Sequence, residues 1–320
     1  MSEYIINKIE KEFGDLFPLL LDTGVTDIEY NEDGKVWIYR IGAETECRQD
    51  VLTPGQVRRL IGSIATYAGV SATEETPIIS ANLPWNNRFQ ANIEPITDSP
   101  TFSVRNHAIS TYPLPQYIES GRIPAETADF LRREITKHSP SNIIVSGSTG
   151  SGKTTFTGAL LNELSDLCPD DRLYIMEDTP ELHVKSQNKN CVRTSKHVTM
   201  TMLLANALRY RPDRIIMGEV RDGAALDLLK SWNTGHPGGI VTLHANSARS
   251  ALDRFEQLVL EAKDMPMSAL RSLIGQAANI VVHLERQPKL GPMIVEVMKV
   301  EGLDNEKTYK TSYVYRHEAV

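Results

Sequence analysis

The eight residues from Gly147 to Thr154 constrain the fold of this chain more than any other segment. They match the pattern G-x-x-x-x-G-K-[ST] completely, and they lie between an apolar, β-rich run at 142–146 and a helical run at 155–164. A strand, a glycine-rich loop and a helix in this order predict a phosphate-binding loop, or P-loop, whose backbone N–H groups face the phosphates. The predicted phosphate-binding residues are Gly147, Ser148, Thr149, Gly150, Ser151, Gly152, Lys153, Thr154 and Thr155.

Two side chains in this loop are expected to contact the ligand. In this pattern the lysine, Lys153, reaches the β- and γ-phosphates, and the hydroxyl of the threonine, Thr154, ligates magnesium. The motif therefore predicts ATP and Mg²⁺ as cofactors. It does not decide whether the nucleotide is hydrolysed, because hydrolysis also needs carboxylates near the magnesium and the attacking water.

Acidic residues at the ends of two later β-rich runs are the candidates for these carboxylates. The run 173–176 leads into Glu177 and Asp178, and the run 215–217 leads into Gly218 and Glu219. Ligands of parallel sheets bind beyond the carboxyl ends of the strands, where these acids are expected to lie. Each acid alone is compatible with an ordinary solvated strand end, but the P-loop favours a functional role for both.

A third segment, 234–246, leads from a glycine-rich loop into a strand that ends at His244, a candidate sensor of the γ-phosphate. A lone histidine is nevertheless more often structural than functional. Arginine is the preferred side chain for stabilising transferring phosphoryl charge, often from a neighbouring domain or subunit. The candidate arginines are Arg88 and Arg105 in the first part of the chain, and Arg209, Arg211, Arg214 and Arg221 around the second acidic run.

The length of 320 residues and the pattern along the chain predict two domains. Residues 1–111 combine amphipathic helical segments with short β-rich runs and dense prolines, which predicts an α+β domain. Residues 112–138 have linker-like composition followed by a connecting helix from about Ala125. In residues 139–320, apolar β-rich runs alternate with helical segments, which predicts an α/β domain with a mostly parallel sheet.

Charge and composition exclude several classes of protein. The net charge of −7 argues against a broad nucleic-acid-binding face, so no strong direct binding to nucleic acid is expected. Cys47, Cys168 and Cys191 show no spacing that suits a disulfide framework or a zinc site, which favours a reducing cytoplasm. No run of about 18 apolar residues occurs, so no transmembrane segment is predicted and any membrane association is expected to be peripheral.

Together, the motifs resemble those of a known family. In order and spacing, residues 147–154, 175–182, 211–222 and 234–246 resemble the Walker A, Asp box, Walker B and His box of the secretion and traffic ATPases. The segments 282–286 and 293–302 resemble the family's closing strands, and 26–28, 83–88 and 102–105 resemble its N-terminal domain more weakly. The short N-terminal domain is similar to that of the TrbB-like conjugal transfer ATPases of type IV secretion systems. Members of the type II branch usually carry a four-cysteine zinc module, which three scattered cysteines cannot supply.

This resemblance implies a RecA-like ATPase domain and a hexameric ring in which ATP hydrolysis between the two domains of each subunit drives rigid-body movement. It implies that Glu177 and Glu219 organise magnesium and the attacking water, and it leaves open which of them is the base. It also implies that His244 couples the γ-phosphate to conformation, and that Arg88 and Arg105 contact phosphates. The implied partners are inner-membrane components of a secretion or conjugation channel, and the implied location is the cytoplasm, peripheral to the inner face of the inner membrane.

Two other functions stay open on the sequence. A RecA-like DNA-dependent ATPase, such as a helicase or recombinase, predicts DNA-stimulated turnover with a steep salt dependence, and the acidic charge balance counts against it. A nucleotide-gated scaffold predicts ATP binding without turnover. The presence of both Glu177 and Glu219 counts against the scaffold.

Overall fold

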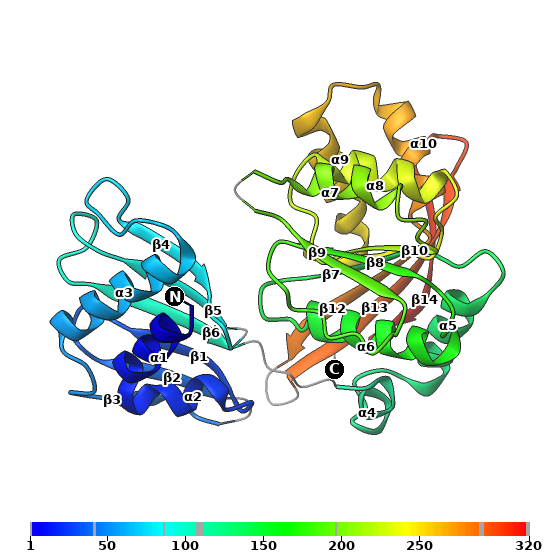
Figure 1. Cartoon of the computed structure of the whole chain (residues 1–320). Helices are drawn as coiled ribbons and strands as arrows, with labels where there is room; N and C mark the ends of the chain where they lie inside the picture. Colours follow the sequence, from blue (N-terminus) through cyan, green and yellow to red (C-terminus); the bar gives the residue numbers. More distant parts are fainter. Residues whose placement is uncertain are drawn as a thin grey trace. The chain divides into compact units, whose positions relative to one another are not determined.

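The structure of the chain is a computed structural model that describes residues 2–40, 43–85, 87–106, 112–195, 197–287 and 291–317. The chain divides into two compact units, Met1–Ser110 and Thr111–Val320 (Figure 1). Within the described ranges, no helix has the length and the apolar character needed to cross a membrane.

The N-terminal unit is an antiparallel sheet with its helices packed on one core (Figure 1). Its strand order is β3-β2-β1-β6-β5-β4. The strands are β1 (Val25–Tyr30), β2 (Val36–Arg40), β3 (Glu46–Arg48), β4 (Ile78–Asn82), β5 (Asn87–Asn92) and β6 (Thr101–Asn106). The helices are α1 (Ser2–Phe13), the 3-10 helix η1 (Gly14–Leu16), α2 (Phe17–Leu21) and α3 (Pro54–Ala68).

Local sequence signals explain where these elements begin and end. Strands β1 and β2 pair as an antiparallel hairpin, and the residues between them, 31–34, include the Asn, Asp and Gly that are typical of such turns. Helix α3 begins after Thr53, whose side chain accepts the N–H of Gln56 while the Gln56 side chain accepts the N–H of Thr53 at 2.8 Å. It ends at Gly69, whose φ of 69° is the left-handed conformation that glycine adopts without strain.

The C-terminal unit is built on an eight-stranded sheet with the order β14-β13-β12-β7-β11-β10-β8-β9. The six strands from β12 to β9 in this order run parallel, and β13 and β14 extend the sheet in antiparallel fashion. The strands are β7 (Ile143–Gly147), β8 (Leu173–Glu177), β9 (Lys189–Arg193), β10 (Arg214–Met217), β11 (Ile240–Leu243), β12 (Ile280–Gln287), β13 (Gly291–Leu303) and β14 (Tyr309–Arg316).

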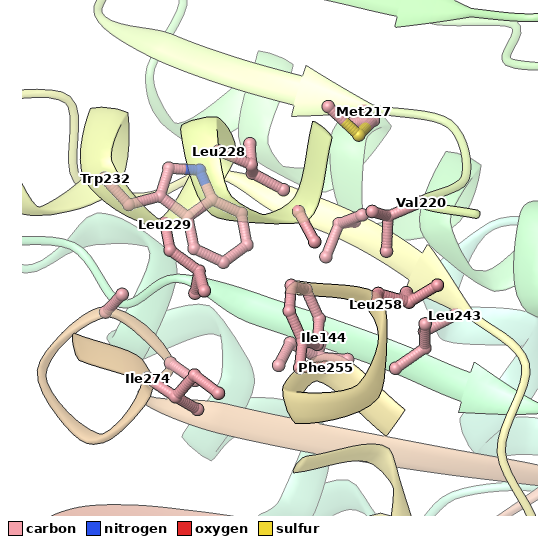
Figure 2. Packing of buried hydrophobic residues seen from close by; sticks show 14 of the residues in the cluster. Ile144, Met217, Val220, Leu228, Leu229, Trp232, Leu243, Phe255, Leu258 and Ile274 are labelled. Carbon is pink, nitrogen blue, oxygen red and sulfur yellow. The ribbon is translucent and has the colours of Figure 1, made fainter. Parts of the chain in front are cut away.

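Helices cover both faces of this sheet and explain why its central strands are apolar throughout (Figure 1). One face carries α7 (Met200–Ala207), α8 (Ala224–Asn233), α9 (Ala248–Ala262) and α10 (Met267–Ala277). The other face carries α4 (Leu114–Glu119), α5 (Ala125–Thr136) and α6 (Lys153–Leu167). Figure 2 shows the first core, which includes Trp232 and Leu229 of α8, Phe255 of α9 and Ile144 of β7.

Some elements differ from what the sequence predicts, and helix α4 and strand β9 are two of them. Residues 112–120 have linker-like composition, yet they contain α4, whose Leu114 and Tyr117 are buried. The Tyr117 ring packs edge-on against Phe156 of α6 at a centroid distance of 5.4 Å, so this apolar contact stabilises a helix that composition alone does not indicate. The sequence pattern also does not predict strand β9, because it lies at the sheet edge and its residues, Lys189–Arg193, alternate between exposed and half-buried.

Candidate functional site

The P-loop connects the carboxyl end of β7, at Gly147, to the amino end of α6, at Lys153. Two of its glycines are required by close contacts with the β12–β13 pair. A Cβ atom on Gly147 would collide with the carbonyl oxygen of Leu284, and a Cβ on Gly152 would lie 2.6 Å from the Cβ of Pro292. Gly152 also has a φ of 90°, which disfavours any side chain. These glycines therefore let the loop lie directly against the sheet.

Lys153 lies inside this loop and is only 8% exposed. Its Nζ donates hydrogen bonds to the carbonyl oxygens of Gly147, at 3.0 Å, and Ser148, at 2.9 Å. Burial lowers the pKa of the ammonium, and the nearby carboxylates of Glu219 and Glu181 partly offset that effect. The lysine is thus held by weak neutral acceptors that a phosphate group can replace.

His244 connects this lysine to the acid at the end of β10. Its Nδ1 lies 3.5 Å from Lys153 Nζ, and its Nε2 lies 3.1 Å from Glu219 Oε1. Burial, followed by the charge of Lys153, lowers the pKa of the imidazole, so the ring is neutral at pH 7. The neutral tautomer that suits both neighbours carries its proton on Nε2, facing the carboxylate, and leaves Nδ1 as an acceptor toward the lysine.

Glu219 has a second partner, Arg221, whose Nη2 lies 2.6 Å from its other carboxylate oxygen. Arg221 is also 3.8 Å from Asp178, and these three residues line a surface pocket. The structure therefore brings together Lys153, His244 and Glu219, and it adds Arg221 to them. Of the four arginines near the second acidic run, Arg221 contacts this cluster.

Glu177 is the last residue of β8, at the carboxyl end of the strand where the sequence predicts it. It is 6% exposed, and its Oε1 accepts the N–H groups of Glu181, at 2.8 Å, and Leu182, at 2.9 Å. Burial raises the pKa of its carboxyl to about 7, although the two N–H donors act in the opposite direction. In the described part of the chain, its side chain shows no hydrogen bond to the P-loop. Its carboxyl instead shapes the loop that follows β8.

That loop brings a different acid to the P-loop, Glu181, which the sequence patterns do not assign to the site. The hydroxyl of Thr154 donates a hydrogen bond to Glu181 Oε2 at 3.1 Å. The pattern of acids at strand ends does not identify Glu181, because this residue lies four positions after the end of β8. The available signal is its place in the Asp-box-like segment 175–182.

A magnesium ion fits the donors at this position. Among the described residues, no group of three or more His, Cys, Asp or Glu side chains forms a complete metal cage. Mg²⁺ does not need one, because it is typically held by one or two protein oxygens, phosphate oxygens and water. The hydroxyl of Thr154 beside the carboxylate of Glu181 supplies such a pair of oxygens.

The two arginines predicted from the first domain lie on neighbouring strands of the N-terminal unit. Arg88 of β5 and Arg105 of β6 are paired in register, and Arg105 Nε donates to Asp27 Oδ1 at 2.9 Å. Their contact with phosphate stays a prediction. Arg214, by contrast, is buried at the amino end of β10 and forms an ion pair with Asp171 at 2.7 Å, which indicates a structural role.

Comparison with known proteins gives a consistent result. The family described as "Type II/IV secretion system protein" matches residues 10–309. The conjugal transfer protein TrbB of Rhizobium radiobacter is 42% identical over 311 residues, which cover 97% of this chain and 94% of that protein. The type IV secretion system protein VirB11 of Bartonella quintana is 30% identical over 311 residues, covering 83% of this chain and 86% of that protein.

A solved structure shows the same fold. The ATPase DotB of Yersinia pseudotuberculosis superposes with a TM-score of 0.63 at 18% identity, covering 93% of this chain and 80% of that chain. With the observed sheet order, this likeness confirms the predicted fold class, a RecA-like P-loop domain with a mostly parallel sheet preceded by a smaller α+β domain.

Proposed function

Because the chain belongs to the type II/IV secretion system protein family, we propose that it is an ATPase that converts ATP and water into ADP and phosphate. The observation that carries this proposal is the line of side chains from Lys153 through His244 to Glu219. It joins the P-loop to a carboxylate at the carboxyl edge of the parallel sheet, which is where ligands of such sheets bind.

Binding of the triphosphate begins with the P-loop and its lysine. The backbone N–H groups of 147–154 and the amino end of α6 attract the phosphates. The Lys153 ammonium exchanges the carbonyl oxygens of Gly147 and Ser148 for phosphate oxygens, which are stronger acceptors because they are charged. Thr154 and Glu181 are the residues that would hold Mg²⁺, which neutralises phosphate charge when bound.

Glu219 is the proposed base and water-positioning group. Arg221 and the Nε2–H of His244 hold its carboxylate in one orientation, and it lies close enough to the lysine to influence the lysine's pKa. A carboxylate positioned in this way orients a water molecule for attack on the γ-phosphorus and accepts its proton. Glu177, whose Oε1 is occupied by two backbone N–H groups, is assigned the shaping of the 178–182 loop instead.

His244 is the proposed coupling residue. Its two ring nitrogens face the lysine and the base, so a shift of Lys153 toward phosphate changes the field that His244 and Glu219 experience. We expect the resulting rearrangement to reach the N-terminal unit, where Arg88 and Arg105 are the proposed phosphate contacts. ATP turnover would thereby drive one unit against the other.

The names of the relatives support the proposed biological role. TrbB is a conjugal transfer protein and VirB11 is a type IV secretion protein, so the proposed role is a hexameric motor for a type IV secretion or conjugation apparatus. It would power assembly of that apparatus or transfer of substrate through it. Its proposed partners are inner-membrane components of the channel, and its proposed place is the cytoplasmic face of the inner membrane.

The test is phosphate release from ATP measured across size-exclusion fractions of the purified chain. Activity in the fraction of hexamer size, reduced roughly 100-fold or more by Lys153→Ala, is expected. Lys137→Ala is the matched control, because Lys137 is an exposed lysine that pairs with Glu134 beside α5. ATP binding without phosphate release would instead establish a scaffold, and turnover that needs DNA and falls steeply with salt would establish a DNA-dependent ATPase.

A further inference from the structure

Three buried polar residues form a row across the sheet beside the P-loop. Ser146 of β7 pairs in register with His283 of β12, which in turn pairs with Glu296 of β13. All three are buried, and His283 is only 2% exposed. Their neighbours on the same strands pack beneath α9, so these polar groups lie within a largely apolar layer. Polar side chains in such a layer are costly unless they bind one another.

The His283 ring binds the residue that precedes the P-loop. Its Nδ1 lies 3.0 Å from the hydroxyl oxygen of Ser146. Burial lowers the pKa of the imidazole, against the opposing charges of Glu296 and Glu285, so the ring is neutral. Its Nε2 faces the carboxylate of Glu285 at 3.7 Å, which favours a proton on Nε2. Nδ1 is then an acceptor, and the Ser146 hydroxyl donates to it rather than to the Val282 carbonyl oxygen, which lies farther away at 3.4 Å.

This bond fixes the first peptide of the P-loop. The residue after Ser146 is Gly147, whose carbonyl oxygen accepts the Lys153 ammonium. Gly147 is also packed against the Leu284 carbonyl of β12, one residue beyond His283. Strand β12 thus contacts the start of the loop twice, once through a side chain and once through its backbone.

The third residue of the row extends the connection to α9. Glu296 Oε2 accepts the N–H of Ala248, the first residue of α9, at 2.7 Å, and Arg316 of β14 pairs with its other oxygen at 3.3 Å. Helix α9 follows directly after the segment that contains His244. The row therefore connects the two segments that meet at the catalytic lysine, one through Ser146 and the other through Ala248.

We propose that His283 is a positioning residue for the P-loop, holding the Ser146–Gly147 peptide in place while Lys153 exchanges carbonyl oxygens for phosphate oxygens. The inference rests on the proposed nucleotide function. A loop whose first peptide is fixed in advance loses less conformational freedom on binding, so its affinity for nucleotide is higher. Loss of this contact should therefore raise KM and the Kd for ATP more than it lowers kcat.

The experiment uses the full chain with His283→Leu, His283→Asn and Ser146→Ala. The Kd for Mg-ATP and the KM and kcat for ATP are measured, together with the thermal midpoint. His283→Leu and Ser146→Ala are each expected to raise Kd and KM about threefold to tenfold, the effect of one neutral hydrogen bond. His283→Asn should restore most of the affinity for ATP, because the amide oxygen of the asparagine side chain can accept the hydrogen bond from the Ser146 hydroxyl. The double variant Ser146→Ala/His283→Leu should bind ATP with about the same Kd as either single variant, because both changes remove the same hydrogen bond.

Thr157→Val is the matched control. Thr157 is fully buried on α6, and its hydroxyl has no hydrogen-bond partner among the residues the structure describes. The Thr157→Val chain should bind Mg-ATP with the same Kd as the wild type. Three results would overturn the inference: a folded His283→Leu chain with unchanged Kd and KM, a His283→Asn chain that binds ATP no better than His283→Leu, or single-variant effects on Kd that multiply in the double variant. If the wild type still turns over ATP, none of these results affects the proposed function. Wild-type ATP binding without turnover would reject the proposed ATPase and leave Kd to decide the role of His283, whereas a wild-type chain that binds no ATP would reject both.

Discussion

Replacement of Glu177 by glutamine should change how the stability of the C-terminal unit depends on pH. The amide side chain would retain a carbonyl oxygen that accepts the N–H groups of Glu181 and Leu182, but it would have no charge to bury. In the wild type, burial raises the pKa of Glu177 from 4.5 to about 7. Such a change corresponds to roughly 3 kcal/mol of unfolding free energy.

The direction in which the unfolding free energy changes with pH follows from proton binding. Between pH 4.5 and about 7, the folded chain keeps the proton on Glu177 and the unfolded chain does not. The unfolding free energy of the wild type therefore falls as pH rises through this window, and the loss is complete above the folded-state pKa. Glu177→Gln removes this contribution, so the variant and the wild type should be similar near pH 5, with the variant more stable by up to roughly 3 kcal/mol at pH 8.

Urea unfolding followed by tryptophan fluorescence at pH 5, 6, 7 and 8 measures this difference. The chain has three tryptophans, so Trp37→Phe and Trp85→Phe in the N-terminal unit leave Trp232 as the reporter of the C-terminal unit. Asp178→Asn is the control, because it removes an exposed acid next to Glu177. If the Glu177→Gln chain showed the same pH slope as its parent, the buried carboxyl would not be the origin of the effect.

Three other changes test the site itself. Glu181→Gln should raise the Mg²⁺ concentration needed for half-maximal ATPase activity, measured by Mg²⁺ titration, whereas a direct effect on kcat at saturating Mg²⁺ would contradict its role beside Thr154. Glu219→Gln should lower kcat by roughly 100-fold or more while ATP binding persists, and a binding defect of similar size would argue against its role as base. Gly152→Ala should weaken nucleotide binding in a folded chain, because its Cβ meets Pro292, and unchanged affinity in a direct binding assay would show that the loop tolerates the shift.

Much of the C-terminal fold can be predicted because its determinants are local. The apolar runs that form β7, β8, β10, β11 and β12 are buried on both sides, and the P-loop pattern identifies the turn after the first of them. Edge strand β9 and helix α4 are not predicted, because their determinants are not local apolar runs. The first is half polar, and the second is stabilised by a contact of Tyr117 with α6 that no local pattern reveals.

The site is harder to predict because side-chain direction depends on the tertiary fold. Arg214 and Arg221 flank the same β-rich run, Arg214 at the amino end of β10 and Arg221 beyond its carboxyl end, so they lie on opposite edges of the sheet. Only the second is near Glu219, and the first is buried with Asp171. In the same way, burial of the Glu177 carboxyl against two backbone N–H groups could not be read from its place at the end of a strand.

The strand order explains which predicted residues meet and which do not. Along the chain, β8 is the next sheet strand after β7, but in the sheet β11 and β10 lie between them. Neighbouring strands are about 4.8 Å apart, so three strand spacings, roughly 14 Å, separate the end of β8 from the end of β7. His244 follows the strand beside β7, and Glu219 follows the next one, so the histidine necessarily lies between lysine and base. An acid that follows β8 can reach Thr154 only through a loop that returns toward β7, and that is the position of Glu181.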